Sequence, residues 1–143
     1  MKKVIWEISI ALFIIASPFV VMAGDFDGSK PLLFAAIEVY EVNPKGCQEI
    51  EAGDINLPNF FIIDFTKKSL TPTPESGITE VSKIERMERV DGLLILQGAE
   101  DGYQDIRDGL GWTLTIDENT GRAVLSASWR NAAFVIFGVC TPK

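Results

Sequence analysis

Short runs of apolar or alternating residues, each ended by turn residues, fill most of the chain after residue 31. This pattern is typical of an all-β domain. Seven candidate strands can be delimited: Leu32–Val42, Asn59–Thr66, Ile78–Val90, Leu93–Leu96, Gly111–Ile116, Arg122–Trp129 and Ala133–Cys140. The sequence therefore predicts an antiparallel meander of about seven strands, closed or nearly closed into a small barrel. A two-sheet β-sandwich is the alternative.

The segment Ile78–Val90 is ambiguous, because its apolar residues recur at every third position and also fit one face of a helix. The dipeptide Asp91-Gly92 that follows it is a strong two-residue hairpin signal. A strand, Leu93–Leu96, comes directly after that turn. We therefore interpret Ile78–Val90 as a strand.

The hairpin from Trp112 to Trp129 can be predicted in register. The loop Glu118–Gly121 would pair Ile116 with Ala123 and place the apolar residues of both strands on one face. Trp112 and Trp129 are then expected on the buried face, and Gly121 is expected in the left-handed conformation that other residues resist.

Most aromatic side chains fall within the candidate strands, where core positions are the simplest interpretation. Phe60 and Phe61 must point to opposite faces, so one of them could contact something outside the main core. A barrel interior could also hold a small apolar ligand. With only seven strands, an interior filled by side chains is the expected outcome.

The first 23 residues have the features of a secretory signal peptide. They begin with a pair of lysines, continue as an apolar run, Val4–Val21, and end in permitted residues before Gly24. Cleavage after Ala23 would leave one β-domain, residues 24–143, in the periplasm or outside the cell. A retained membrane anchor is the alternative, because the apolar run approaches the length of about 17 to 25 residues that spans a bilayer.

The chain has two cysteines, Cys47 and Cys140. An oxidising compartment would allow them to pair. In a meander with an odd number of strands, the first and last strands leave the sheet at the same end, which would bring the two thiols together. A further strand within Gln48–Leu57 would break this argument.

The composition argues against several classes of partner. Without the signal segment the chain keeps 11 basic and 19 acidic residues, a net charge of −8. An acidic surface repels phosphate backbones and anionic headgroups. We therefore expect no nucleic-acid partner and, after signal cleavage, no membrane partner.

The residue types also restrict the chemistry. The chain contains no histidine, which removes Ser–His and Cys–His nucleophile pairs and histidine-based metal sites. No glycine-rich phosphate motif is present, so no catalytic residue is assigned and no cofactor is expected. The acidic loop after the fourth strand could supply oxygen ligands to Ca²⁺, which takes about six to eight. Its candidate ligands are Glu100, Asp101, Asp105 and Asp108, although their spacing differs from that of an EF-hand and a solvated loop is the alternative.

Several short motifs together resemble a group of small exported bacterial proteins that have no assigned activity. The motifs are Asp27–Leu33, Leu94–Gly98, Gly111-Trp112 followed by Asp117–Gly121, and Phe137–Cys140. The resemblance implies export and a shared fold, but no reaction, cofactor or site residue. Members of the group carry further cysteines near the start, where this chain has Phe34, so the resemblance implies no second bridge here.

The leading functional hypothesis is an exported, non-enzymatic β-domain that binds a small molecule or a protein partner. The alternative is a carboxylate-dependent hydrolase acting outside the cytoplasm, because two carboxylates about 5 to 9.5 Å apart can hydrolyse a glycosidic bond. A cleft with two facing acids, one of them in an apolar wall, would favour the hydrolase.

Overall fold

The computed structural model describes residues 24–101 and 109–143. Within these ranges the chain forms strands and two short 3₁₀ helices, η1 (Ala52–Ile55) and η2 (Pro74–Ser76), which confirms the all-β prediction. The described strands are β1 (Leu32–Asn43), β2 (Gly46–Ile50), β3 (Phe60–Asp64), β4 (Ser69–Pro72), β5 (Ser82–Lys83), β6 (Arg86–Val90), β7 (Leu93–Glu100), β8 (Leu110–Asp117), β9 (Arg122–Trp129) and β10 (Ala132–Pro142).

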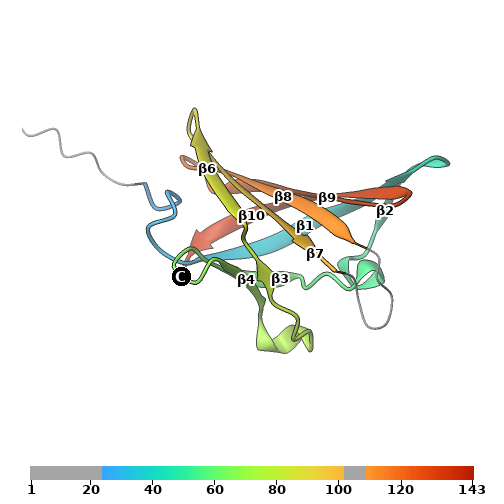
Figure 1. The fold of residues 1–143 in the computed structure, drawn as a ribbon, viewed down its shortest axis with the longest axis horizontal. Helices are drawn as coiled ribbons and strands as arrows, with labels where there is room; N and C mark the ends of the chain where they lie inside the picture. Colours follow the sequence, from blue (N-terminus) through green and yellow to red (C-terminus); the bar gives the residue numbers. More distant parts are fainter. Residues whose placement is uncertain (1–23, 102–108) are drawn as a thin grey trace, which may run out of the picture.

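Nine of these strands form one antiparallel sheet in the order β5-β4-β3-β1-β10-β9-β8-β7-β6, and β2 pairs with β1 outside this path. The sheet curls into a half-barrel, with β3 and β4 lying below β7, β8 and β9 in the view of Figure 1. The predicted antiparallel, barrel-like sheet is therefore confirmed, with ten described strands in place of the predicted seven or so.

One segment connects the two ends of the curled sheet. The predicted strand Ile78–Val90 is divided into β5, which pairs with β4, and β6, which pairs with β7. Between them, the Ile84 N–H donates to the Lys68 carbonyl at 2.8 Å, and the Glu85 N–H donates to the Gln97 carbonyl at 2.9 Å. Adjacent residues thus bond to opposite ends of the sheet, and this exchange of partners nearly closes the barrel.

The register of the β8–β9 hairpin is confirmed. Ile116 pairs with Ala123, Trp112 pairs with Ala127, and Gly121 has a φ of 71°. The expectation that Trp129 is buried is wrong, because 44% of this residue is exposed. Trp129 ends β9 and pairs with Ala132 at the rim of the sheet, past the last paired residues of β8 and β9.

Side chains fill the space that the sheet encloses. Phe34 is fully buried, and its ring stacks on Phe61 with the ring centroids 4.5 Å apart. The largest fully buried side chains come from strands all around the curl and from the crossing segment: Leu32, Phe34, Ile63, Ile84, Leu96, Leu114, Ile116 and Ile136. The interior of the described structure is a packed core, as predicted, although the sheet has more strands than the seven on which that prediction was based.

The predicted disulfide between Cys47 and Cys140 is wrong. Both thiols are free, Cys140 opposite Phe34 on β1 and Cys47 opposite Val42. These two positions on β1 are about 26 Å apart along the strand, whereas bridged Cα atoms lie within about 7 Å.

The sequence predicts that the two cysteines meet because an odd number of strands would put the ends of the first and last strands together. Instead, the first and last strands, β1 and β10, are antiparallel neighbours, and β2 follows β1 as a hairpin. Their C-terminal ends therefore lie at opposite ends of the sheet. Burial raises the pKa of the Cys140 thiol to about 12, which leaves it a poor nucleophile.

Candidate functional site

The proposed calcium ligands are only partly placed. Glu100 and Asp101 are exposed at the end of β7, where Glu100 accepts a hydrogen bond from the Ser82 hydroxyl. Asp105 and Asp108 lie outside the described residues. In the ranges 24–101 and 109–143, no three His, Cys, Asp or Glu side chains gather closely enough to hold a metal ion.

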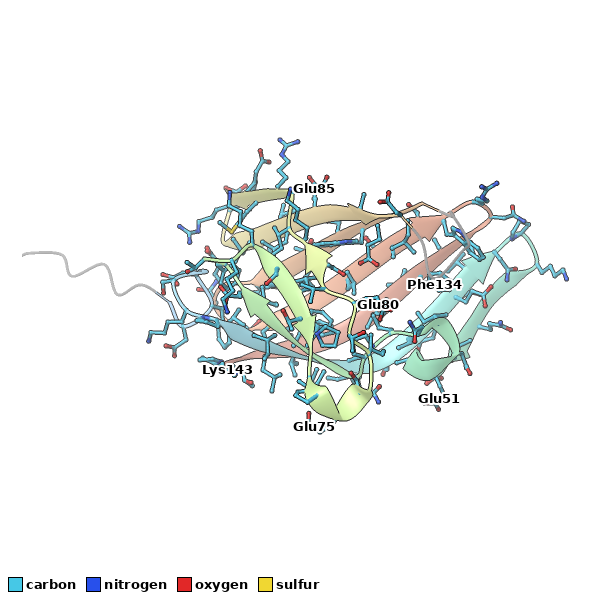
Figure 2. All side chains as sticks on the ribbon, turned by 60° about the horizontal axis from the view of Figure 1, so that its bottom comes forward. Glu51, Glu75, Glu80, Glu85, Phe134 and Lys143 are labelled. Carbon is cyan, nitrogen blue, oxygen red and sulfur yellow. The ribbon has the colours of Figure 1, made fainter. Side chains whose placement is uncertain are left out.

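The carboxylates that a hydrolase would need are not buried: Glu38 and Glu49 both act on Tyr40, but both are exposed. Figure 2 shows Glu51, Glu75, Glu80 and Glu85 apart from one another. No polar or charged residue is buried in the described part of the chain, so none of these acids has an apolar wall around it. The described structure contains no arrangement that favours the hydrolase.

The two carboxylates with displaced pKa values serve turns. Asp64 accepts the backbone N–H groups of Thr66 and Lys67, and Asp27 accepts that of Ser29. Asp27 also interacts with the Ser29 side chain, which is the largest cause of its lowered pKa, and the backbone hydrogen bond of Lys67 is the largest cause for Asp64. Hydrogen bonds of this kind stabilise the ionised forms. A general acid needs a raised pKa, so neither group fits that role.

The most distinctive surface is an apolar patch on the outside of the sheet, opposite the core. Four large side chains expose between 37% and 63% of their surface there. They surround a groove of about 500 Å³ that is open to solvent. We call the four residues the outer patch: Ile37, Leu93, Val124 and Phe137.

Strand alternation builds most of this patch. On β10, Ile136 and Gly138 face the core, and Phe137 between them faces outward. Phe137 pairs with Val124 on β9, which is likewise flanked by core residues. The same residues that fill the core on one face thus dictate an apolar surface on the other.

A β-bulge adds the most exposed member. The register between β1 and β10 shifts between Ala36 and Glu38, so Ile37 is an extra residue in β1. Its side chain is 63% exposed and lies beside Phe137 in the groove. Bulges of this kind disrupt the ladder locally and redirect a side chain, and they are common next to active sites.

Phe137 is held in place by a neighbour. The ring of Tyr40 packs edge-on against it, with centroids 6.1 Å apart and an angle of 80° between the planes. The Tyr40 hydroxyl donates to Glu38 at 3.2 Å. This hydrogen bond and the negative charge of Glu38 raise the pKa of Tyr40. An aromatic contact of this type orients Phe137 at modest energetic gain.

Charged residues of both signs border the outer patch: Glu38 on the β1 side, and Arg122 with its neighbour Asp117 on the side of β9 and β8. Glu38, on β1, pairs directly with Phe137. Arg122, on β9, pairs with Val139, two residues further along β10. Within the described residues no carboxylate lies close enough to Arg122 for an ion pair. Its guanidinium is therefore available to a group outside the domain.

A second open groove, of about 530 Å³, lies next to the outer patch on the same sheet. Its lining mixes polar and apolar residues, and Gln97 donates to the Thr113 hydroxyl at 3.4 Å within it. Glu85 is the one carboxylate among its lining residues. The groove therefore lacks the pair of acids that glycoside hydrolysis requires.

No family model, curated protein or solved structure matches this chain. No helix in the described ranges has the length and apolar character needed to cross a bilayer.

Sequence reasoning did not identify the outer patch, although one signal for it exists. In the run Ala133–Cys140, Val135, Phe137 and Val139 alternate with Phe134 and Ile136, so both faces of the strand are apolar. A sheet covered on one side only would show polar residues at the outward positions.

Proposed function

We propose that this protein is an exported, non-enzymatic β-domain that binds a protein partner through the outer patch. The observation that carries the proposal is the exposure of Phe137 and Ile37, 44% and 63%, around a single groove. Contiguous exposed apolar side chains on a soluble domain mark interaction sites. An aromatic anchor surrounded by smaller apolar groups is the common composition of a binding hot spot.

A protein partner fits this surface better than a small molecule does. Pockets for small ligands are usually concave and bury most of the ligand, whereas both grooves here are open and the core is packed. A broad, shallow apolar surface with charges at its edge has the composition of a protein–protein interface.

The test is to recover tagged protein from the cell envelope of its host and to identify the proteins bound to it, untagged copies included. Phe137→Glu should abolish this co-purification, because a charge at the centre of an apolar interface loses its hydration on binding. Trp129→Glu is the matched control, since Trp129 is also 44% exposed but lies at the rim of the opposite face. Identical bound proteins for wild type and Phe137→Glu would contradict the proposal.

Export rests on the N-terminal sequence: two lysines, the apolar run Val4–Val21, and the permitted residues before Gly24. Cleavage after Ala23 would keep Phe26, which packs against the core of the described structure. The intact mass of protein from the cell envelope should correspond to a chain that starts at Gly24. A full-length mass in the membrane pellet would instead support a retained anchor.

A further inference from the structure

We propose that the partner is a second copy of this chain, docked face to face through the outer patch about a two-fold axis that runs along β10. This inference rests on the proposed function and specifies its partner. In an isologous dimer of this kind the same patch must be complementary to itself. The positions of the apolar and charged groups around β10 meet that requirement.

The first observation is where the outer patch lies in the sheet. β10 is the middle strand of the nine-stranded order, and Phe137 lies on it. The sheet curls around its core, so its outer face is convex (Figure 1). A second copy approaching a convex face contacts only the strands near the middle. These strands are β9, β10 and β1, which carry Val124, Phe137 and Ile37. Leu93, the fourth residue of the outer patch, is on β7 and lies outside this contact.

The second observation is that a two-fold axis along β10 pairs apolar groups with apolar groups. The rotation places Phe137 opposite Phe137 of the second copy. It also places β9 of one copy over β1 of the other, so Val124 faces the bulge of the second copy, where Ile37 lies next to Glu38. In the sheet, Val124 and the bulge at Ile37 flank the same residue, Phe137, on opposite sides. The bulge thus supplies an apolar group where the axis requires one.

The third observation is charge complementarity. Arg122 lies on the β9 side of the axis and Glu38 on the β1 side. The rotation therefore brings Arg122 of each copy toward Glu38 of the other copy, which gives two equivalent contacts. Arg122 is level with Val139 and Glu38 is level with Phe137. The two side chains are therefore offset by two residues along the strand, about 6.6 Å, which a long arginine side chain can span. A patch with only one sign of charge would repel its own copy.

The experiment measures the dissociation constant of the purified mature protein by sedimentation equilibrium, from micromolar to near-millimolar concentration. Wild type should form a dimer that Phe137→Glu abolishes. Arg122→Glu alone and Glu38→Arg alone should each weaken the dimer by about tenfold or more, because each places like charges opposite one another. The double variant Arg122→Glu/Glu38→Arg should return the constant to within about threefold of wild type.

The double variant is decisive because it keeps the net charge of the chain and reverses only the two edge charges. Both positions are exposed, and circular dichroism confirms that each variant is folded. Restoration of the dimer supports a contact between residue 122 of one copy and residue 38 of the other. A dimer that the double variant fails to restore overturns the proposed axis.

The inference and the proposed function fail in different ways. A wild-type protein that is monomeric at every concentration overturns the second-copy inference. The wild-type protein could be monomeric and yet co-purify with a different protein from the host. If Phe137→Glu removes that protein, the proposed function stands with another partner. If the protein is monomeric and Phe137→Glu changes nothing that co-purifies, both are overturned.

Discussion

Replacing Gly98 with alanine should reduce the free energy of unfolding by about 3 kcal/mol, at the upper end of what overpacking costs. A Cβ atom at this position would lie 2.4 Å from the Lys83 carbonyl oxygen and 2.4 Å from Cζ2 of Trp112. The first neighbour is backbone of β5, within the segment that connects the two ends of the sheet. Relief of the clash therefore requires that this connection move.

Gly111→Ala is the matched control. Gly111 lies on β8, the strand that pairs with β7, and no heavy atom lies within 4 Å of its potential Cβ. The same substitution there should change the unfolding free energy by no more than about 0.5 kcal/mol. Urea denaturation of the two variants gives the comparison. Equal effects would mean that Gly98 is costly for a reason other than the closure of the sheet.

Gly98 also explains an unusual feature of the core. The indole ring of Trp112 occupies the space that a side chain at position 98 would need. Its Nε1 is buried and has no hydrogen-bond partner among the described residues. An unsatisfied buried donor costs free energy, so the apolar contacts of this ring outweigh that cost. The close approach of β5 and β7 depends on both residues.

Parts of the fold could be predicted because they depend on contacts close in sequence. The β8–β9 hairpin is such a case, since alternation and the loop Glu118–Gly121 fix the register without reference to any other element. The strand Leu93–Leu96 follows a turn, Asp91-Gly92, whose residues both have positive φ. Local steric preferences decide these structures.

Other elements depend on partners distant in sequence, and their own residues carry little signal. β2 is a short edge strand with four exposed residues out of five, so it has no apolar face that would indicate a strand. β4 is four residues long and ends at Pro72, within a proline-rich segment that resembles a loop. The disulfide prediction failed for the same reason, because the pairing of β1 with β10 is a non-local choice.

The outer patch combines both situations. The outward position of Phe137 follows from strand alternation and was open to prediction. The position of Ile37 depends on a register shift between β1 and β10, which the sequence of one strand does not reveal. The outer patch forms only because particular strands become neighbours, and the order of the strands in the sheet cannot be predicted from any one strand.

Two adjacent phenylalanines of β3 provide the second large effect. Phe61 is 3% exposed and its ring stacks on Phe34, whereas Phe60 is 48% exposed on the other face of the strand. Phe61→Ala should reduce the unfolding free energy by about 3 to 5 kcal/mol, since it removes buried surface and leaves a cavity. Phe60→Ala should cost less than about 1 kcal/mol, because much of its ring is already hydrated.

This pair isolates the effect of strand alternation, because the residue type, the strand and the substitution are the same. The two residues differ in burial: the Phe61 ring is buried against Phe34, and the Phe60 ring is not. Phe61 faces Phe34 across the β1–β3 pair, so its removal also leaves that fully buried ring without its stacking partner. Chemical denaturation of both single variants measures the difference. Equal losses of stability would mean that Phe60 is also covered, and that the outer face of β3 contributes to an interface in solution.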